Sequence, residues 1–308
     1  MPSVTGRPPA WFSMSDATNI YEYGERIVYK VRDDYILKRT PRGPNVEVET
    51  HCFVAANTNI PVPRIYGEWL SPDRYYHFIL EQKIRGQTLG SAWDYFSKSD
   101  KLYLARQVDA MMARLGRFKS TRMQTISGTR LLTNGFVPHP DPLPFLSGRW
   151  ATDEAIFDNE FLPPLSRAGV TAPLIRVIRA TMPPCDKDLV LTHCDLFLGN
   201  VMVDFARVRV TGIIDWESAG FWPEWFQYAR ITHGVNRNDA EWKALLSKVM
   251  RERGQVRHAE YGRVWWEAVA RLLENAESET ARVWLRLLVS YGKGEVGVEE
   301  LKNYRKWK

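Results

Sequence analysis

Three polar side chains in the second half of the chain have the types and the spacing that phosphoryl transfer requires. Asp195 and Asn200 lie five residues apart in a loop after the apolar run 189–192, and Asp215 ends a second β-prone run, 210–215. An acid, an amide and a second acid in this order can converge on one point. Phosphoryl transfer needs metal ions for the phosphates and a carboxylate that orients the attacking hydroxyl and accepts its proton.

The sequence around these residues resembles that of a known family. His193-Cys-Asp195-Leu-Phe-Leu-Gly-Asn200, followed by Ile-Ile-Asp215-Trp-Glu217, is similar to the motif of the aminoglycoside phosphotransferase and choline kinase family, including a fungal-type branch of it. The resemblance implies that Asp195 is the catalytic base and that Asn200 and Asp215 bind Mg²⁺. It also implies that His193 braces the loop through hydrogen bonds. A satisfied loop histidine beside a solvated acid is the alternative for this pair taken alone.

The same resemblance implies partners in the first half of the chain. Lys38 is similar to the strand lysine that contacts the α- and β-phosphates, and Glu47 is similar to its ion-pair partner, with Glu49 as a rival. Gly24 falls where a loop would cover the phosphates, although the chain has neither a Gly-x-Gly-x-x-Gly nor a Walker A sequence. A surface lysine and a surface glutamate are the alternative interpretation.

The segment 80–89 resembles the hinge between the two lobes of a kinase. Backbone groups of Glu81, Gln82 and Lys83 would bind adenine there. The resemblance therefore implies an enzyme that uses ATP and Mg²⁺ and transfers the γ-phosphoryl group to a hydroxyl of a small molecule. An amino alcohol, an aminoglycoside-like compound or a secondary metabolite would be the acceptor.

Acidic and aromatic residues of the second half are candidates for binding that acceptor. Glu217 and Asp158 could meet a cationic acceptor, and Trp222 could offer an aromatic face to an amine. Surface charge or core packing is the alternative for each. Cys194 stands where the family commonly has glycine. We predict that it packs rather than reacts, and that Cys194→Gly keeps most activity with a stability loss of ~1 kcal/mol.

Hydrophobic periodicity predicts the elements that position these residues. The runs 26–31 and 35–38 indicate a hairpin, 47–57 a helix and 75–81 a strand. After Gly86 the chain becomes mainly helical, with an apolar stripe over 102–115 that Ser99 could cap. Further helices are expected from Thr152, over 258–275 and from Glu279 to Gly292, and a surface loop over 133–146.

These elements indicate an α+β class and, with the resemblance, a bilobal protein-kinase-like fold. Residues 1–84 would form a small N-terminal lobe with an antiparallel sheet and one helix. Residues 85–308 would form a larger, mainly helical lobe with the catalytic loop and acceptor site, the two making one kinase-like domain. Only residues 218–224 separate Glu217 from the next helical pattern, which leaves no room for the activation loop of a protein kinase.

Composition excludes several other classes. The 308 residues are 44% hydrophobic, and the 42 basic and 36 acidic residues are interspersed, so we expect no nucleic-acid partner despite the basic segment 302–308. No apolar run approaches the ~20 residues of a membrane span, and the first 16 residues lack the pattern of a signal peptide. Three cysteines favour a reducing, cytoplasmic location. The pairs 51–52 and 193–194 lack the usual spacing of zinc ligands.

A second function belongs to another class. The chain could be a catalytically inert nucleotide-binding pseudokinase with a regulatory or scaffolding role, because fold does not fix function. The presence of Lys38, Glu47, Asp195, Asn200 and Asp215 argues against it. The expected partners are a nucleoside triphosphate and a small-molecule acceptor, and the sequence does not indicate an oligomeric state.

Overall fold

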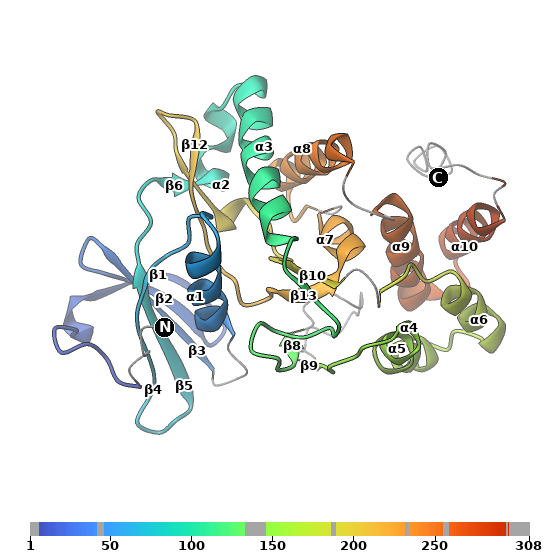
Figure 1. Ribbon diagram of the computed structural model, residues 1–308, viewed down its shortest axis with the longest axis horizontal. Helices are drawn as coiled ribbons and strands as arrows, with labels where there is room; N and C mark the ends of the chain where they lie inside the picture. The colour runs from blue at the N-terminus through green and yellow to red at the C-terminus, as the bar shows by residue number, and fades with distance from the viewer. Residues whose placement is uncertain are drawn as a thin grey trace. The chain divides into compact units, whose positions relative to one another are not determined.

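The structure is a computed structural model that describes residues 6–41, 46–132, 146–185, 189–231, 234–254, 259–293 and 295. It contains two compact units (Figure 1). Unit 1 comprises Met1–Met111 and Leu196–Glu217, and unit 2 comprises Met112–Asp195 and Ser218–Lys308. The units do not follow the expected division at residue 84. The segment Leu196–Glu217 belongs to unit 1 because it is hydrogen-bonded to the earlier part of the chain. For example, the Ile213 N–H donates to the Pro61 carbonyl at 2.9 Å.

An antiparallel sheet forms the first part of unit 1. Its order is β1 (Ala17–Tyr23), β2 (Arg26–Val31), β3 (Tyr35–Pro41), β5 (Tyr76–Gln82) and β4 (Ile65–Leu70). The hairpin and the strand predicted from the sequence are therefore confirmed as β2, β3 and β5, whereas β1 and β4 were not predicted. Val31, Leu37 and Leu80 form a buried cluster in this sheet.

Helix α1 (Glu47–Asn57) has the bounds that the sequence predicted. It packs beside β4 and lies along the sheet of unit 1 (Figure 1). Val48 and Val54 are buried on its inner face. The last helical turn is completed by the Thr58 N–H, which donates to the Val54 carbonyl at 3.0 Å. The helix ends there because the residues before Pro61 favour an extended backbone.

A second, smaller sheet completes unit 1 in the order β12 (Arg209–Ile213), β11 (Val201–Asp204) and β6 (Gln87–Thr88). Three short helical turns accompany it: α2 (Leu89–Ala92), η2 (Trp93–Tyr95) and η4 (Leu198–Asn200). A further turn, η1 (Met14–Asp16), directly precedes β1 of the first sheet. Gly86 enters β6 with φ +108°, and a Cβ there would lie 2.2 Å from the Val203 carbonyl oxygen. Only glycine therefore allows β6 and β11 to approach each other this closely.

Helix α3 (Lys98–Leu115) contains the predicted apolar stripe, and the boundary between the units falls within it. The expected cap at Ser99 is wrong. The Ser97 hydroxyl accepts from the Asp100 N–H at 3.2 Å, so Ser97 holds the capping position, two residues earlier.

Unit 2 is mainly helical around a three-stranded sheet of order β13 (Gly220–Pro223), β10 (Leu189–Thr192) and β7 (Lys119–Ser120). A second pair is β8 (Leu131–Leu132) with β9 (Leu146–Ser147). The helices are α4 (Asp153–Ile156), the π-helical turn η3 (Phe157–Phe161), α5 (Leu162–Arg167), α6 (Ala172–Ala180), α7 (Glu224–Arg230), α8 (Arg237–Arg253), α9 (Ala259–Asn275) and α10 (Glu279–Gly292).

One buried hydrophobic cluster holds unit 2 together, and in it the Trp265 ring makes edge contacts with both Phe161 and Trp225. The predicted helix start at Thr152 is confirmed, because its side chain accepts from the Ala155 N–H at 3.1 Å. The predicted helices over 258–275 and 279–292 are confirmed as α9 and α10. Most of the loop expected over 133–146 lies outside the described residues.

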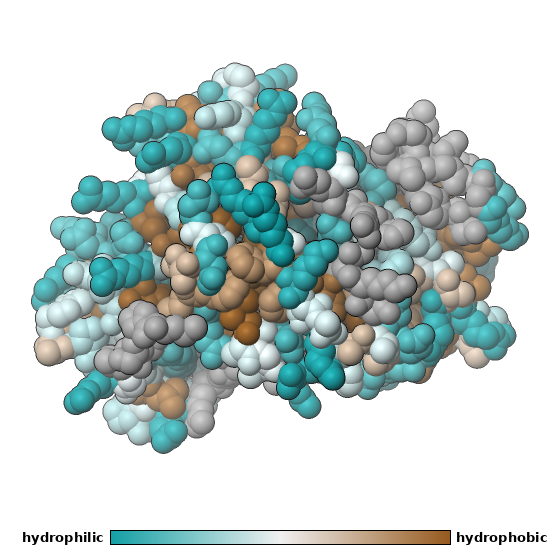
Figure 2. Space-filling view, viewed as in Figure 1, coloured by the Kyte–Doolittle hydropathy of each residue, from teal (hydrophilic) through white to brown (hydrophobic). Residues whose placement is uncertain are grey.

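Polar residues cover much of the face shown in Figure 2, with hydrophobic residues between them. This pattern agrees with the interspersed charges of the sequence. Among the helices that the structure describes, none has the length and apolar character needed to cross a membrane.

Candidate active site

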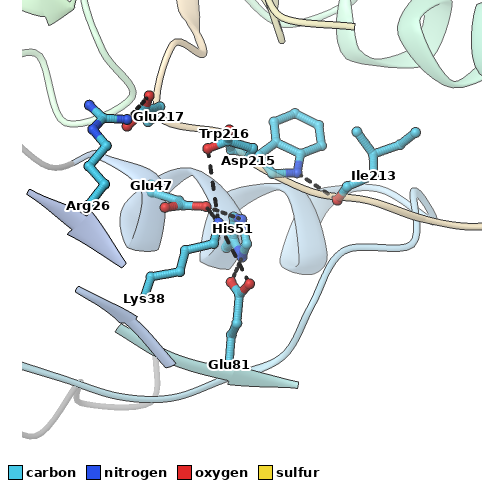
Figure 3. Close-up of polar contacts among 9 residues, drawn as sticks. All are labelled: Arg26, Lys38, Glu47, His51, Glu81, Ile213, Asp215, Trp216 and Glu217. Atoms are coloured by element: carbon cyan, nitrogen blue, oxygen red, sulfur yellow. Dashed lines mark hydrogen bonds and ion pairs between the residues drawn. The ribbon is translucent and has the colours of Figure 1, made fainter. Parts of the chain in front are cut away.

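Lys38 lies at the centre of a polar cluster in unit 1. The residues opposite it are Val28 on β2 and Ile79 on β5, which fixes the face of the sheet that its side chain shares. Its ammonium is ion-paired with the Glu47 carboxylate of α1 (Figure 3). Glu49 is exposed. The ion pair expected from the sequence is therefore present, and Glu47 rather than Glu49 forms it.

A second buried carboxylate completes the cluster. Glu81 Oε1 on β5 lies 3.6 Å from Lys38 Nζ. The His51 ring of α1 lies between the two acids, with Nε2 3.6 Å from Glu47 Oε1 and Nδ1 3.9 Å from Glu81 Oε2. All three side chains are almost fully buried (Figure 3). The sequence predicted an adenine-binding role for the Glu81 backbone, and the structure adds this place for its side chain.

Two buried acids near one lysine have an electrostatic cost. Burial raises the pKa of Glu81 to about 8; Lys38 opposes this effect, whereas the charges of Glu47 and Asp215 add to it. Burial likewise raises the pKa of Glu47, against the attraction of Lys38. Burial alone would lower the pKa of Lys38, but the three carboxylates around it raise the pKa above its ordinary value. Lys38 therefore stays a cation, and the surplus negative charge favours a proton on the acids.

Asp215 faces the same lysine from the segment after β12. Its Oδ1 lies 4.0 Å from Lys38 Nζ, and its side chain is 37% exposed. Its backbone has φ +64°, a left-handed conformation that costs energy for a residue other than glycine. Two hydrogen bonds made by the next residue, Trp216, hold the Asp215 backbone in this conformation. The Trp216 indole N–H donates to the Ile213 carbonyl at 2.9 Å, and the Trp216 backbone N–H donates to Glu47.

Asn200 is tied through its backbone to the segment of Asp215. Its N–H donates to the Phe197 carbonyl at 2.9 Å, and its own carbonyl accepts from the Ile214 N–H at 3.0 Å. An amide oxygen and a carboxylate are hard oxygen donors, which suit Mg²⁺. The donor set of Asn200 and Asp215 therefore fits the metal that the sequence motif implies.

Glu217 forms an ion pair with Arg26 at the start of β2. Arg26 Nη1 lies 2.6 Å from Glu217 Oε1 (Figure 3). The side chain of Glu217 is 19% exposed and that of Arg26 is 43% exposed. The sequence proposed Glu217 as an acceptor-binding residue and did not single out Arg26.

The segment from His193 to Asp195 belongs to unit 2, where the structure shows how its backbone is braced. The Asp195 N–H donates to His193 Nδ1 at 3.2 Å, which supports the bracing role expected for this buried histidine. Between them, the Cys194 N–H donates to Gln227 Oε1 at 3.1 Å, and the Cys194 carbonyl accepts from Arg230 Nε at 3.3 Å. Helix α7 thus holds the backbone immediately before Asp195.

The thiol of Cys194 is buried, and its backbone has φ +63°. Burial raises its pKa to about 12, more than its bond with Thr192 lowers it. All three cysteines are free thiols. Within the described ranges, the one grouping of metal-ligand type is Glu47, His51 and Glu81, which contains no cysteine. A zinc site at either His-Cys pair therefore has no support.

Two N–H groups of the expected hinge are already used inside unit 1. The Gln82 N–H donates to the Arg64 carbonyl and the Lys83 N–H to the Asp34 carbonyl, both at 2.8 Å. Adenine binding at this segment would need its other backbone groups. Gly24 occupies a two-residue loop between Tyr23 and Arg26 with φ +57°, a conformation that glycine adopts without strain.

Two of the expected acceptor residues have other surroundings. Trp222 is 1% exposed, its indole N–H donates to the Ser218 carbonyl at 3.2 Å, and its ring packs on Phe226. These contacts correct the acceptor role expected for Trp222 in favour of core packing, because its ring offers no face to a solute. Asp158 is half-exposed and ion-paired with Arg179.

From the sequence, neither His51 nor Arg26 was expected at the nucleotide site. His51 lies one turn after Glu47 on α1, so helical spacing alone was a signal for its proximity. The signal for Glu81 was a single acid at the end of the otherwise apolar run Phe-Ile-Leu. Strand alternation places Glu81 on the same face as Ile79, which lies opposite Lys38.

Comparisons with known proteins identify the family and the fold of the chain. The model of the phosphotransferase enzyme family matches residues 24–261. A thermostable mutant of aminoglycoside phosphotransferase APH(4)-Ia is similar with a TM-score of 0.54 and 15% identity, covering 92% of this chain and 96% of that one. APH(2'')-IIa with streptomycin and ATP gives a TM-score of 0.53 and 14% identity, over 92% and 93%.

The GDP complex of aminoglycoside 2'-phosphotransferase-IIIa gives a TM-score of 0.52 and 16% identity, covering 94% of this chain and 93% of that one. The search of curated proteins found no match. The fungal-type branch stays a prediction. The chain belongs to the phosphotransferase enzyme family and has the kinase-like fold of the aminoglycoside phosphotransferases.

Proposed function

We propose that the chain is an ATP- and Mg²⁺-dependent kinase that transfers the γ-phosphoryl group to a hydroxyl of a small molecule. The observation that carries the proposal is the cluster of unit 1, in which Lys38 is ion-paired with Glu47 and lies 4.0 Å from Asp215. A lysine fixed by a helix glutamate beside a half-exposed carboxylate suits a nucleotide phosphate next to a metal ion.

Each residue of the cluster has a proposed task. Lys38 binds the α- and β-phosphates, and Glu47 keeps its ammonium in place. Asn200 and Asp215 hold Mg²⁺, which neutralises charge on the phosphates when bound. Gly24 allows the tight loop near the phosphates, and the segment Glu81–Lys83 receives adenine through backbone groups other than the two N–H groups already used.

Asp195 is the proposed general base. Its carboxylate orients the acceptor hydroxyl and takes its proton as the oxygen attacks the γ-phosphorus and the bond to the β-phosphate oxygen breaks. His193 positions the Asp195 backbone through their hydrogen bond. No covalent enzyme intermediate is needed, which agrees with the buried, high-pKa thiol of Cys194.

The test is release of ADP in the presence of purified protein, Mg²⁺ and a panel of amino alcohols, aminoglycosides, sugars and secondary metabolites. Solved relatives are described with ATP and with GDP, so ATP and GTP should be compared. Acceptor-dependent ADP release that Asp195→Asn abolishes would support the kinase. Nucleotide binding without turnover for any acceptor would favour the inert nucleotide-binding alternative.

A slow Mg²⁺-dependent hydrolysis without acceptor separates the two functions early. The kinase should show it, because water can replace the hydroxyl. The intact ion pair of Lys38 with Glu47 and the carboxylate of Asp215 disfavour the inert alternative, since loss of one such group is the simplest way to inactivate the fold.

A further inference from the structure

We propose that Arg26 is a second phosphate-binding side chain of unit 1 and that Glu217 is the positioning residue that orients it. The inference rests on the proposed function and deepens it. It assigns a task to a residue that the sequence motif does not include, and it gives Glu217 a task other than acceptor binding.

The register of the sheet places Arg26 beside the phosphate lysine. Val28 lies opposite Lys38, and Arg26 precedes Val28 by two residues, so Arg26 and Lys38 share one face of the sheet. Arg26 begins β2 directly after the two-residue loop of Gly24 and Glu25. The loop and the strand therefore bring a cation to the side of the sheet where Lys38 meets Asp215 (Figure 3).

The guanidinium of Arg26 uses only part of its hydrogen-bond donors. Nη1 donates to Glu217 Oε1 at 2.6 Å, and its other N–H groups have no hydrogen-bond partner among the residues that the structure describes. At 43% exposure the group is open to a ligand, whereas Lys38 is nearly buried and held by Glu47. A planar fork of free N–H groups matches two phosphate oxygens, which a single ammonium does not.

The carboxylates around Arg26 keep its guanidinium in the charged form. Burial would lower the pKa of Arg26, but the bond to Glu217 and the charges of Asp215 and Glu47 raise it. Arg26 is therefore within electrostatic reach of the same acids that face Lys38. Glu217 holds it by one nitrogen, and this leaves the remaining fork for an anion.

The position of Glu217 supports a positioning task. It lies two residues after Asp215, in the segment that the hydrogen bonds of Trp216 fix. The Glu217 carboxylate therefore comes from the same short segment as the proposed metal ligand Asp215. Its Oε1 is occupied by Arg26. Glu217 thus ties the start of β2 to the Asp215 segment within unit 1.

The experiment measures binding of adenosine, AMP, ADP and ATP with Mg²⁺ by calorimetry, with wild-type protein and with Arg26→Ala. We expect Arg26→Ala to weaken ATP by about 10-fold or more, since a charge-assisted bond is lost, and to leave adenosine unchanged. Arg26→Lys, which keeps the charge but not the fork, should give an intermediate ATP affinity.

Arg39→Ala is the matched control. Arg39 is the neighbouring arginine on β3, on the opposite face of the sheet, with its guanidinium over the Tyr76 ring. It should leave the ratio of ATP to adenosine affinity unchanged. Melting curves confirm that each variant is folded.

Glu217→Ala tests the positioning role. We expect ATP to bind a few-fold more weakly and adenosine as before. Unchanged ATP affinity in Arg26→Ala would overturn the inference while the kinase proposal stands. A loss of acceptor turnover in Glu217→Ala with normal nucleotide affinity would make Glu217 an acceptor residue and also overturn it. Failure of wild-type protein to bind any nucleotide would overturn both proposals.

Discussion

Lys38 Nζ on β3 lies 4.0 Å from Asp215 Oδ1, in the segment after β12, and both belong to unit 1. The contact joins the two halves of the sequence pattern, because Lys38 comes from the first half and Asp215 from the second. An ammonium and a carboxylate at this distance attract each other without using all of their hydrogen-bonding capacity. Both groups therefore keep hydrogen-bonding capacity for the ligands proposed for them, a phosphate at Lys38 and a metal at Asp215.

The proposed role of Asp195 as general base is tested by Asp195→Asn. This variant should fold and bind nucleotide but lose acceptor phosphorylation by about 10²-fold or more, because a positioned base typically contributes 10²–10⁴. Asp204→Asn is the control, since Asp204 is paired with Arg207 at the end of β11. Initial rates of acceptor-dependent ADP release check the prediction, and near-normal turnover in Asp195→Asn would rule out the role.

The proposed role of Asp215 as a metal ligand is tested by Asp215→Ala. We expect nucleotide binding to lose its dependence on Mg²⁺, because a direct ligand of the metal is removed while the contacts to adenine remain. Asp215→Asn is a useful companion, since asparagine tolerates the left-handed backbone that Asp215 adopts. Mg²⁺ titration at fixed nucleotide gives the measurement. A metal affinity equal to that of the wild type would contradict the assignment.

The buried acid predicts a pH dependence of stability. Glu81 has an ordinary pKa of 4.5 that burial raises to about 8, so the folded state keeps a proton that the unfolded state has released between these values. The free energy of unfolding should therefore fall as pH rises through this window. Glu81→Gln should reduce this pH dependence. Its free energy of unfolding relative to that of the wild type should rise by on the order of a few kcal/mol between about pH 5 and about pH 9.

Denaturant unfolding of the metal-free protein at both pH values checks this prediction. Glu68→Gln, on the neighbouring strand β4 beside His77, controls for loss of a carboxylate elsewhere in the sheet. A constant difference between Glu81→Gln and the wild type across the pH range would show that the Glu81 carboxyl does not retain the proton.

Cys194 should be inert and replaceable by glycine. Its thiol pKa of about 12 leaves little thiolate at neutral pH, so alkylating reagents should react with the half-buried Cys52 before Cys194. Peptide mapping after brief alkylation measures this order. Rapid labelling of Cys194 in folded protein would contradict the packing role.

The structure also changes the stability expected for Cys194→Gly. The sequence alone predicted a loss of ~1 kcal/mol from added backbone freedom. The observed φ of +63° offsets it, because glycine adopts this conformation without the ~1–2 kcal/mol cost that other residues carry. We now expect a change within about 1 kcal/mol, measured by denaturant unfolding, with most activity retained.

Local pattern was enough for the elements whose signals lie within a few residues. Helix α1 begins at Glu47 and ends at Asn57 as predicted, because periodicity and the following prolines act locally. The Thr152 cap is equally local. Local pattern did not decide between neighbouring serines as the cap of α3, and the chain uses Ser97 instead of Ser99.

The sequence by itself determined the candidate motif, since Asp195, Asn200 and Asp215 are recognised by type and spacing. Only the tertiary structure decided which side chains surround Lys38. Strand register brings Glu81 to the same face, and the ion pair between Arg26 and Glu217 joins residues 191 positions apart. Such partners depend on how distant strands align, which no local propensity encodes, and burial then sets their charge by removing water from the acids.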